Sequence, residues 1–588
     1  MSTSRKLVVL RLIIAVLAFS ICIQISAQQP YAPNAVHPAP LWFEDVAAQA
    51  GLTMLNVNGG VDTKRYILET TGSGVAILDY DHDGWPDILL MNGASQGTGR
   101  EMGSRNDAPT PHLYRNLHNG HFADVTHAAG LDRLTGWGQG ACVGDYDNDG
   151  YDDLYLTYYG HNRLLHNERN GTFREVAGPA GVTGSGRAWG TGCAFIDFDR
   201  DGKLDLFVAN YVDFDVDTVP KPGEGVMCIW KGTPAMCGPR GLPYTPNLLY
   251  RNRGDGTFED VSQRSGITKT NGHYCFSTTS LDADEDGWPD LYVACDSTAS
   301  ILYRNNHDGT FTDIAADAGV AYNDEGREQA GMGVTIGDAG GDGHTYIFKT
   351  NFSDDTSSLY REDKAGQFSW AIPDAGLALN TQYLGWGTMF FDPDNRGMLD
   401  LVIANGHVYP EVDTAHLGAS YKEPRLLYYG DGHGHFTDLS ASSGPGITSA
   451  ASGRGLATAD LWNDGRTEVV INNMSGRPSL LVNRSVNRNH WLDVQLQGTR
   501  SNRDGIGARV TVIVSGKVHV GEVRSGGSYI SSSDLRLHFG LGDATAISEV
   551  DVCWPSGLEE HFKVARIDRL LTLREGTGVR QPNPAELP

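Results

Sequence analysis

A nine-residue acidic pattern occurs four times in the chain, and its residue types could bind a metal ion. In each copy the first, third, fifth and ninth residues are Asp and the sixth is Gly. Oxygen ligands that converge in a tight, glycine-containing loop are typical of Ca²⁺ sites. Carboxylates this close repel one another, which favours a bound cation over a solvated acidic turn without metal. The predicted ligands are Asp79, Asp81, Asp83, Asp87, Asp145, Asp147, Asp149, Asp153, Asp197, Asp199, Asp201, Asp205, Asp282, Asp284, Asp286 and Asp290.

Three further copies of the pattern are incomplete. Gly340 and Tyr346 replace two ligands in the fifth copy, and Arg396 stands at the fifth position of the sixth copy, where its charge could substitute for an ion. The seventh copy keeps three carboxylates, which are Asp460, Asp464 and Glu468. We therefore expect four Ca²⁺ ions, with the seventh loop as a candidate for a fifth.

Short strands must hold these loops. Apolar runs precede and follow each loop, as at 74–78 and 88–91, and an apolar residue stands where an EF-hand would have its bidentate Glu. A second recurring pair of runs, such as 113–116 and 122–125, is joined by a turn containing Asn-Gly or Asp-Gly, which is typical of a hairpin. Each repeat therefore predicts four antiparallel strands, with the metal loop between the first two.

The phase of the repeats predicts a closed ring. The outer-strand motif Phe43-Glu44-Asp45-Val46 occurs before the first loop, whereas the last repeat ends near residue 483 without such a strand. We expect residues 41–47 to complete the seventh blade beside 479–484, and we favour this closure over an open solenoid, whose ends would need caps. The fold class predicted is all-β, a seven-bladed β-propeller over 28–487. A small β-sandwich over 488–575 and a flexible tail over 576–588 follow it.

Charge and the leader segment limit the location and the partners. The formal net charge is −26 and no basic patch opposes it, which argues against nucleic acid as a partner. Residues 1–27 carry basic residues and then an apolar run, which predicts a signal peptide cleaved near Ala27, with a retained membrane anchor as the alternative. We expect a secreted protein, extracellular or periplasmic, without an integral membrane segment after cleavage.

The cysteines agree with export. Cys228 and Cys237 bracket a Pro-rich insertion and are predicted to form a disulfide. Cys275 and Cys295 replace residues that recur as Gly and Asn in other repeats, and two departures on paired strands of one repeat predict a second disulfide. The other cysteines of the mature chain are interpreted as buried small apolar residues: Cys142, Cys193 and Cys553.

A ligand is expected on the face opposite the metal loops. Three insertions, 93–111, 211–246 and 406–424, lie in connections predicted on that face. An aromatic platform there is one interpretation of three residues that precede acidic loops, and packing between blades is the other: Trp137, Trp189 and Tyr274. His407 stands near Glu411 and Asp413 in the sequence and could act as a general base or form a transition-metal site with them, although a structural loop is the favoured alternative.

These motifs resemble a known family. The Asp-rich repeats are similar to FG-GAP/VCBS repeat proteins, which include the heads of integrin α chains, where similar loops bind Ca²⁺. The segments 501–509, 537–542 and 554–557 look like the ASPIC/UnbV domain. The combination is similar to the cartilage acidic protein family, and the resemblance implies a secreted calcium-binding protein without a defined catalytic mechanism.

The function expected is a calcium-stabilised, adhesion-like scaffold that recognises an extracellular protein or glycan. One alternative is a propeller enzyme, a lyase or hydrolase acting on polysaccharide through His407. The other alternative is an accessory factor for the maturation of another exported protein.

Overall fold

The computed structural model describes residues 41–94 and 108–580. The predicted signal peptide, part of the first insertion and the end of the predicted tail lie outside the described residues. Strands dominate the described chain, and its α-helices are single turns, so the all-β expectation is confirmed. Among the described residues, no helix combines the length and the apolar character needed to cross a membrane.

The described residues form seven four-stranded antiparallel sheets, numbered here in the order of their acidic loops. In each sheet the acidic loop joins the first strand to the second. Sheets 1 to 4 contain β2 (Val75–Leu78), β3 (Asp87–Leu90), β4 (His112–Asn116), β5 (Phe122–Asp124); β6 (Trp137–Gly144), β7 (Asp153–Tyr159), β8 (Arg163–Asn167), β9 (Phe173–Glu175); β10 (Gly190–Ile196), β11 (Asp205–Asn210), β14 (Leu248–Asn252), β15 (Phe258–Asp260); and β16 (Cys275–Leu281), β17 (Asp290–Cys295), β18 (Ile301–Asn305), β19 (Phe311–Asp313). Sheets 5 to 7 contain β20 (Val334–Gly337), β21 (Tyr346–Lys349), β22 (Ser358–Lys364), β23 (Gln367–Trp370); β24 (Gly385–Phe391), β25 (Asp400–Asn405), β26 (Leu426–Gly430), β27 (Phe436–Asp438); and β28 (Gly453–Ala459), β29 (Glu468–Asn473), β30 (Ser479–Asn483), β1 (Phe43–Asp45).

Neighbouring sheets are held together by apolar cores. The first strands contact one another in a closed cycle, in the order β2, β6, β10, β16, β20, β24, β28 and back to β2. A cluster of buried apolar side chains fills each junction between neighbouring sheets, including the junction between sheets 7 and 1. Burial of this apolar surface is the main force that holds the sheets side by side.

The N-terminal strand joins the last sheet. In β1, Phe43 pairs with Asn483 and Asp45 pairs with Leu481 of β30. The carboxylate of Asp45 also accepts the backbone N–H of Leu480 (3.2 Å). The strand thereby occupies the place that the missing outer strand of the seventh repeat would take.

Short helices and one small hairpin connect the strands. Several of these helices end at a glycine in the left-handed region, such as Gly181 (φ 82°) after Ala177–Ala180. The helices are α2 (Ala47–Ala50), α3 (Ala177–Ala180), α4 (Ala315–Ala318), α5 (Ile372–Ala375), α6 (Glu411–Ala415), α7 (Pro445–Thr448), η1 (Ile67–Glu69), η2 (Val226–Cys228), η3 (Ile267–Lys269) and η4 (Ser440–Ser442). The hairpin consists of β12 (Ile229–Trp230) and β13 (Thr233–Pro234).

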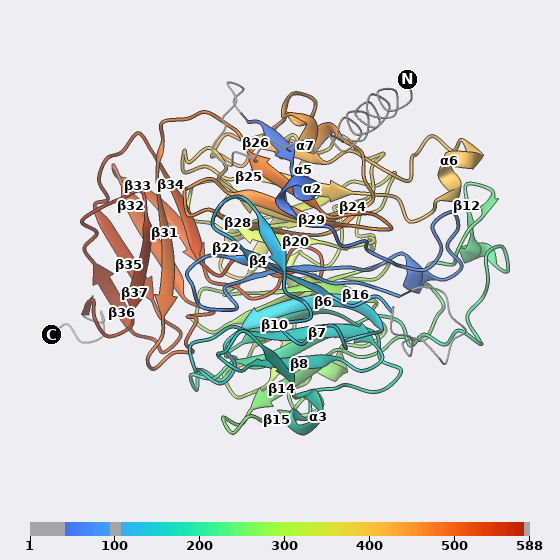
Figure 1. The fold of residues 1–588 in the computed structure, drawn as a ribbon, viewed down its shortest axis with the longest axis horizontal. Helices are drawn as coiled ribbons and strands as arrows, with labels where there is room; N and C mark the ends of the chain where they lie inside the picture. Colours follow the sequence, from blue (N-terminus) through green and yellow to red (C-terminus); the bar gives the residue numbers. More distant parts are fainter. Residues whose placement is uncertain (1–40, 95–107, 581–588) are drawn as a thin grey trace, which may run out of the picture.

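The C-terminal region forms two further sheets, on the left in Figure 1. Apolar side chains from both sheets, including Val494, Val512 and Val552, share one core. The sheet that contains β36 extends to Arg580, five residues beyond the expected boundary at 575. The carboxylate of Glu560 accepts the backbone N–H groups of Gly576 and Gly578, both at 2.8 Å. The strands are β31 (His490–Gln497), β34 (Leu537–Gly542), β37 (Leu570–Arg574) in one sheet and β33 (Lys517–Glu522), β32 (Arg509–Val514), β35 (Glu549–Cys553), β36 (Glu559–Phe562), β38 (Val579–Arg580) in the other.

Between β33 and β34, residues 524–534 leave the C-terminal sheets and enter the centre of the ring. This axial segment contacts the first strand of every one of the seven sheets. A Cβ on Gly526 would lie 2.4 Å from the carbonyl oxygen of Cys193 in β10. The hydrogen bonds to the other six are Ser525 Oγ to Val143 O (2.8 Å), Gly527 N to Thr278 O (2.9 Å), Val334 N to Ser528 O (2.8 Å), Thr388 N to Ser528 Oγ (3.1 Å), Ser532 N to Val75 O (2.9 Å) and Thr458 N to Ser533 Oγ (3.1 Å).

Glycines on the first strands make room for the axial segment. A Cβ on Gly74 would lie 2.1 Å from the carbonyl oxygen of Ile530, and one on Gly140 would lie 2.9 Å from the same atom. Such approaches are too close for any other residue type. These two glycines therefore make room for the axial segment, whereas other recurring glycines make room for the neighbouring first strand: a Cβ on Gly192 would lie 2.3 Å from the carbonyl oxygen of Phe276.

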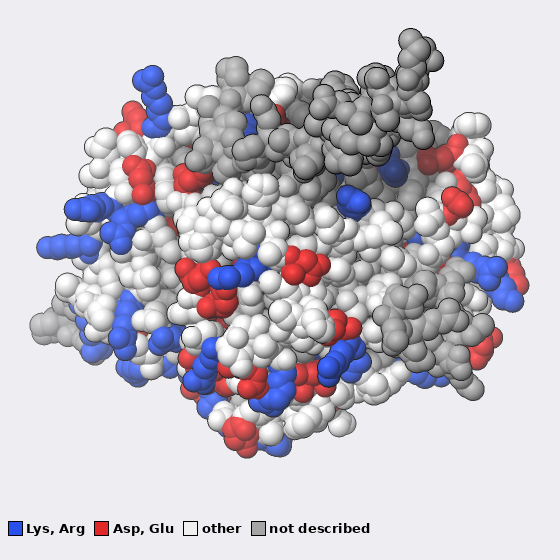
Figure 2. Space-filling view, viewed as in Figure 1, with Lys and Arg blue, Asp and Glu red and all other residues white. Residues whose placement is uncertain are grey.

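Charged groups are distributed unevenly over the surface. In Figure 2, Lys and Arg side chains gather over the C-terminal sheets on the left, while both signs are interspersed along the lower edge. Much of the net charge of −26 belongs to the acidic loops, whereas residues 488–580 carry 12 Lys and Arg against 11 Asp and Glu, so the C-terminal domain adds no net negative charge beside the loops.

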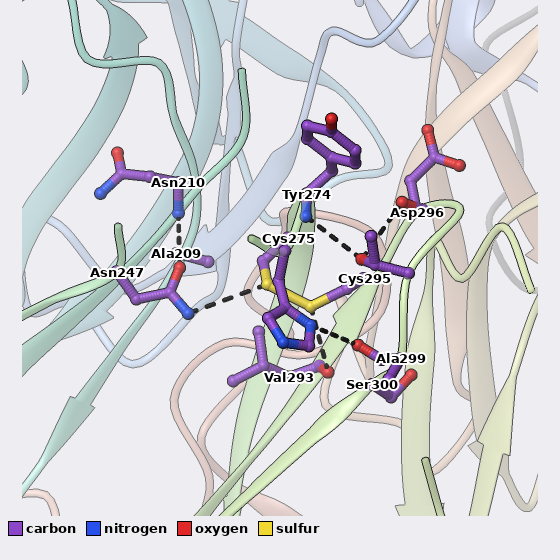
Figure 3. The surroundings of a disulfide bond; sticks show 12 residues. Ala209, Asn210, Asn247, Tyr274, Cys275, Val293, Cys295, Asp296, Ala299 and Ser300 are labelled. Carbon is purple, nitrogen blue, oxygen red and sulfur yellow. Dashed lines mark hydrogen bonds between the residues drawn. A yellow bond between two sulfur atoms is a disulfide. The ribbon is translucent and has the colours of Figure 1, made fainter. Parts of the chain in front are cut away.

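The structure contains three disulfides among the described residues. Cys228–Cys237 closes the insertion that carries β12 and β13, and Cys275–Cys295 joins directly paired residues of β16 and β17 (Figure 3), so both predicted pairs are confirmed. The third disulfide, Cys142–Cys193, joins sheets 2 and 3 and corrects the interpretation of these two cysteines as buried small apolar residues. Cys553, interpreted in the same way, is free but exposed.

Candidate functional site

All seven acidic loops share one backbone conformation, which the first loop illustrates. The carboxylate of Asp79 accepts the backbone N–H groups of Asp83 (2.9 Å) and Gly84 (2.8 Å). His82 and Gly84 both have positive φ, at 57° and 87°, which turns the chain sharply enough to bring the later carboxylates back toward the first. The same pair of hydrogen bonds recurs at the first residue of the other loops: Asp145, Asp197, Asp282, Asp338, Asp392 and Asp460.

The complete loops bring their predicted ligands together. Carboxylate oxygens of Asp79, Asp81 and Asp87 lie within 4.8 Å of one another, and so do oxygens of the corresponding residues of the third loop. In the second loop the first, third and fifth residues form such a group. The groups in these two loops are Asp197, Asp199, Asp205 and Asp145, Asp147, Asp149.

Each complete loop leaves one buried carboxylate oxygen without a hydrogen-bond donor among the described residues. An anionic oxygen buried in this way is strongly destabilising unless a cation or proton satisfies it. The oxygens are Asp81 Oδ1, Asp153 Oδ2, Asp199 Oδ1 and Asp284 Oδ1. The residues present therefore fit a divalent cation, and Ca²⁺ suits a set composed of carboxylate oxygens.

Burial raises the pKa of the loop carboxyls, because charge is costly away from water. It raises the pKa of Asp87 to about 9, that of Asp290 to about 8, and those of Asp197 and Asp282 to about 7. Neighbouring carboxylates of the same loop add to the effect, while backbone N–H donors oppose it. A bound dication would reverse this balance and keep the carboxylates ionised.

An arginine from the third strand lies against the loop in sheets 1 and 3. Arg115 Nε lies 2.6 Å from Asp81 and Nη2 lies 3.2 Å from Asp83. Arg251 contacts Asp199 (2.5 Å) and Asp201 (2.9 Å) in the same way. These arginines supply part of the positive charge around each site. The repeated Leu-Tyr-Arg-Asn motif is the sequence signal for this role, although the loop pattern alone does not reveal it.

The Asn that ends this motif ties neighbouring sheets together. The backbone N–H of Asn252 donates to Asp205 Oδ1 (2.7 Å), the ninth residue of its own loop. The Asn252 side chain donates to the carbonyl oxygen of Tyr146 (2.8 Å), the second residue of the preceding loop. The same bridge to the preceding loop recurs at Asn116, Asn167, Asn305 and Asn483. Among the described residues, an Asn therefore links five of the seven pairs of neighbouring loops.

Replacement of Asn252 by Ala is expected to destabilise the protein by about 2–3 kcal/mol, because it leaves the buried carbonyls of Tyr146 and Leu204 without their donor. Urea unfolding in the presence of Ca²⁺ measures this change. Asn306→Ala is the matched control, since the Asn306 side chain is partly exposed and bonds only to nearby threonines. A loss no larger than that of the control would contradict the bridging role.

The incomplete loops carry an arginine among their carboxylates. Arg396 Nε lies 2.8 Å from Asp394, its Nη2 contacts Asp400, and the guanidinium stacks on Tyr429, as expected for a cation that replaces an ion. In the fifth loop Arg361 bonds to Asp342 and Tyr346, both at 2.9 Å. In the seventh loop, where Asp460, Asp464 and Glu468 were predicted as a fifth site, Arg466 pairs with Asp464. That site remains a prediction.

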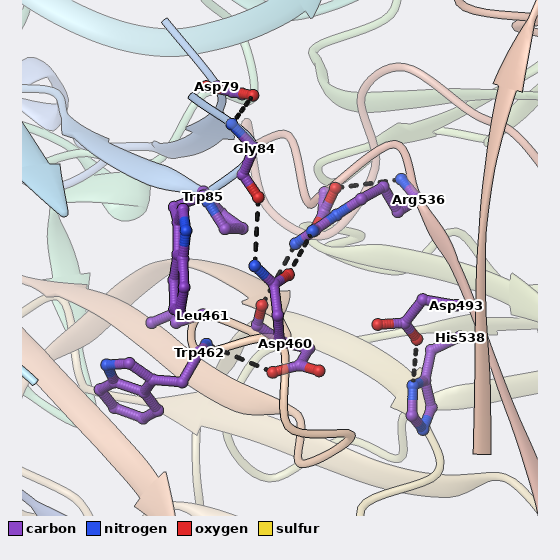
Figure 4. Close-up of polar contacts among 12 residues, drawn as sticks. Asp79, Gly84, Trp85, Asp460, Leu461, Trp462, Asp493, Arg536 and His538 are labelled. Carbon is purple, nitrogen blue, oxygen red and sulfur yellow. Dashed lines mark hydrogen bonds and ion pairs between the residues drawn. The ribbon is translucent and has the colours of Figure 1, made fainter. Parts of the chain in front are cut away.

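The C-terminal domain covers the loop face of the ring. Arg536 donates to the side chain of Asn463 (2.7 Å) and to the carbonyl oxygen of Asp460 (3.1 Å), and Figure 4 shows it beside the seventh loop. His538 bonds to Asp493 (2.6 Å) and to Asn395 of the sixth loop (2.7 Å). Burial lowers the His538 pKa, but the charges and hydrogen bond of nearby carboxylates outweigh it and raise this pKa to about 9. A cavity of about 660 Å³ lies between the C-terminal domain and the loop face of the ring.

A second cavity, of about 450 Å³, lies at the opposite end of the ring, beneath the insertions that carry β12 and α6 on the right of Figure 1. Its lining is largely aromatic and apolar, with a few polar groups between them. The aromatic lining residues are Tyr211, Trp230, Phe276, Phe352, Trp386 and Tyr409. Asp296, Gln329 and Asp355 supply polar atoms. Such a composition is typical of a pocket for an organic ligand.

Of the two interpretations of Trp137, Trp189 and Tyr274, the buried side chains fit packing and not an exposed aromatic platform. Trp137, Trp189 and Tyr274 are at most 7% exposed. The Trp189 ring packs edge-on against Tyr211, and the Tyr274 hydroxyl donates to the carbonyl oxygen of Leu242 (2.8 Å) in the insertion. They are packing residues because the insertions cover the rim, which cannot be judged from the repeat alone.

The position of His407 does not suit a general base, because the side chain has no access to solvent or substrate. Its side chain is fully buried among Trp230, Phe352 and Tyr409, and its Nδ1 accepts the backbone N–H of Tyr409 (3.1 Å). Burial, with the charge of Arg454, lowers the His407 pKa to about 3. No carboxylate among the described residues bonds to the ring. The structural alternative for His407 therefore holds.

Comparisons with known proteins agree with this architecture. The ASPIC and UnbV family model matches residues 498–580, and the FG-GAP-like repeat model matches 102–156, 145–208, 241–293 and 282–349. Cartilage acidic protein 1 of Homo sapiens is 23% identical over 537 residues, covering 87% of this chain and 74% of that protein. The Mus musculus protein of the same name is 23% identical over 510 residues, covering 82% and 70%.

Similarity to solved structures is weak. A structure of an Agrocybe aegerita lectin, described as recognising non-reducing terminal N-acetylglucosamine, matches with a TM-score of 0.36 at 16% identity, covering 68% of this chain and 85% of the other. The match adds nothing to the assignment, which rests on the repeats, the C-terminal domain and the relatives. The chain belongs to the family that joins FG-GAP-like repeats to a C-terminal ASPIC and UnbV domain, and it is related to cartilage acidic protein 1.

Proposed function

We propose that this chain is a secreted, calcium-binding scaffold that recognises an extracellular protein or glycan. In this proposal residues 1–27 are a signal peptide, the seven sheets are the blades of a seven-bladed β-propeller, and the two C-terminal sheets form a β-sandwich. The closed cycle of contacts among the first strands and the pairing of β1 with β30 support the propeller.

Calcium is proposed as a structural cofactor. Four ions bound by the complete loops would satisfy the four unpartnered carboxylate oxygens and neutralise much of the charge. The seventh loop is a candidate for a fifth ion, with the reservation that Arg466 already pairs with one of its carboxylates. The ions would stiffen the loops onto which the C-terminal domain docks.

The observation that carries the recognition role is the aromatic cavity at the end of the ring opposite the C-terminal domain. The C-terminal domain occupies the loop face, so a partner has access to the opposite face. There, Val226, Met227 and Ile229 of the disulfide-closed insertion are exposed at the edge of the cavity, with exposed fractions of 88%, 45% and 48%. Exposed apolar groups beside a preformed pocket are typical of a binding surface.

Screening immobilised glycans and extracellular proteins against the full chain tests the role. Trp230→Ala is expected to weaken binding of any true ligand at least about tenfold, because Trp230 forms one wall of the cavity. Trp288→Ala is the matched control, since Trp288 lies in the fourth acidic loop and stacks on His307. Binding that both variants retain equally would contradict recognition by this cavity. The polysaccharide-enzyme alternative is not favoured, because His407 is buried and its pKa is low.

A further inference from the structure

The second acidic loop differs from the others in the residue that faces it. The third strands of sheets 1, 3, 4 and 5 place an arginine opposite the loop, whereas β8 has His166 at the equivalent position. The strand pairing shows that His166 and Arg115 occupy equivalent positions. Each is the middle of three paired residues in its outer hairpin, where His166 pairs with Arg174 of β9 and Arg115 pairs with Ala123 of β5. One charged donor group is therefore replaced by an imidazole that can act as a metal ligand.

The imidazole and two carboxylates converge on one point. His166 Nδ1 lies 3.4 Å from Asp147 Oδ2 and 3.5 Å from Asp153 Oδ1. These three residues form a group whose possible ligand atoms all lie within 4.8 Å of one another. Three arginines lie near this loop, but none of them forms an ion pair with Asp147 or Asp153 among the described residues. Arg169 pairs with Asp149 (2.6 Å), Arg174 pairs with Glu168, and the backbone N–H of Arg503 donates to Asn148 (2.7 Å).

One buried oxygen of this group, Asp153 Oδ2, has no hydrogen-bond partner among the described residues. The Asp153 side chain is 1% exposed, and its other oxygen already accepts the backbone N–H of Asn167 (2.7 Å). His166 Nδ1 makes only two long contacts, of 3.4 and 3.5 Å, with the carboxylates. A buried carboxylate oxygen without a partner, beside a ring nitrogen held only by long contacts, indicates a missing cation.

The ligand types decide which cation fits. Ca²⁺ prefers an all-oxygen shell, whereas imidazole nitrogen with carboxylate oxygen suits Zn²⁺ and other first-row transition metals. Zn²⁺ bonds of about 2.0–2.1 Å in a tetrahedral site separate the ligand atoms by about 3.4 Å, close to the 3.4 and 3.5 Å between the nitrogen and the two oxygens. In the second loop the nitrogen lies at the third and ninth carboxylates, whereas in loops 1 and 3 a guanidinium, which cannot bind a metal, contacts the third carboxylate. His118, beside the first loop, lies elsewhere, since its ring stacks on Trp85 and its Nε2 contacts Asp83 (2.9 Å).

We propose that His166, Asp147 and Asp153 form a transition-metal site, selective for an ion such as Zn²⁺ over Ca²⁺, within the second acidic loop. The inference rests on the proposed metal-binding role of the loops, and it assigns the second loop a different ion from loops 1, 3 and 4. The protein then carries two kinds of metal in one ring of otherwise similar loops.

Cobalt titration of the full chain tests the site. The protein is stripped with a chelator, saturated with millimolar Ca²⁺ and titrated with Co²⁺, whose visible absorption reports the number and type of its ligands. One equivalent of Co²⁺ is expected to bind despite the Ca²⁺ and to be displaced by Zn²⁺. His166→Ala is expected to weaken this binding at least about 100-fold. Removing a residue that only hydrogen-bonds to a metal ligand weakens metal binding by about 10- to 100-fold, and removing the ligand itself weakens it more.

Two further variants separate the possible outcomes. His166→Arg gives the second loop the arrangement of the first, so it is expected to abolish Co²⁺ binding while the fold is kept. His561→Ala removes another mixed group, formed with Glu549 and Asp551 in the C-terminal sheets, and is expected to leave the single equivalent unchanged.

Equal Co²⁺ affinity in the wild type and in both His166 variants would overturn the proposal, and so would loss of binding in His561→Ala alone. The calcium content of the same samples, measured by elemental analysis, is a separate readout. Absence of Ca²⁺ from the wild type would contradict the calcium scaffold, whereas Ca²⁺ without a His166-dependent Co²⁺ site would contradict only this inference.

Discussion

Removal of Ca²⁺ with EDTA is expected to lower the melting temperature by about 8 °C, and added Ca²⁺ is expected to restore this loss. At free Ca²⁺ of about 100 times Kd, each site stabilises the folded state by roughly 2.7 kcal/mol, so the three sites of loops 1, 3 and 4 contribute about 8 kcal/mol. An unfolding entropy of about 2 cal/mol/K per residue makes 1 kcal/mol equivalent to about 1 °C in a chain of this length. Differential scanning calorimetry measures the shift.

The pH dependence of the same melt provides an internal control. Without metal, burial raises the pKa of Asp197 and Asp282 to about 7 and that of Asp290 to about 8. A carboxyl with a raised folded pKa stabilises the fold fully below its unfolded pKa of about 4, and this contribution is lost as the pH rises through the folded pKa. The melting temperature in EDTA is therefore expected to fall as the pH rises from about 4 to about 8, and Ca²⁺, which binds ionised carboxylates, is expected to remove this fall. An unchanged melt in EDTA would contradict the calcium proposal.

Replacement of Tyr529 by Ala is expected to destabilise the whole protein by about 3–5 kcal/mol. Tyr529 belongs to the axial segment and is fully buried, with its ring edge-on against Phe276 and Trp386 and its hydroxyl bonded to Thr71 O (2.6 Å). Truncation would leave a cavity at the centre of the ring and loosen the connection between the two parts of the chain. Urea unfolding followed by tryptophan fluorescence measures the change.

Tyr529→Phe is the matched control for this cavity. It keeps the ring and removes only the hydrogen bond to Thr71, so a loss of about 1–2 kcal/mol is expected. The two variants together separate ring packing from hydrogen bonding. If Tyr529→Ala were no less stable than Tyr529→Phe, the axial segment would not anchor the C-terminal domain in the ring.

Features within one repeat are predictable from the sequence because they depend on local spacing. The acidic loops, their flanking strands and the Cys275–Cys295 disulfide all lie between adjacent antiparallel strands, where a residue and its partner are close in the sequence. The phase of the Phe-x-Asp-Val motif likewise indicates that residues 41–47 have a place beside 479–484, where β1 lies.

Features that join different repeats cannot be predicted from the local spacing of residues within one repeat. The Cys142–Cys193 disulfide connects two sheets, and its cysteines occupy strand positions that any small apolar residue could fill. The axial segment consists largely of Ser and Gly and is indistinguishable from a surface turn until the surrounding ring is known. The position of the C-terminal domain over the loop face depends on contacts such as that of Arg536 with the seventh loop, which no local pattern encodes.

The pairing of β1 with β30 determines when the protein can finish folding during synthesis. Asp45 and Leu480 are bonded although they are 435 residues apart in the sequence. At roughly 5–20 residues per second, a ribosome needs roughly 20–90 s to make the segment between them. The first strand has no neighbour during that interval, and an unpaired strand edge promotes aggregation. Co-production of a chaperone that shields the nascent N-terminus is therefore expected to raise the yield of folded protein.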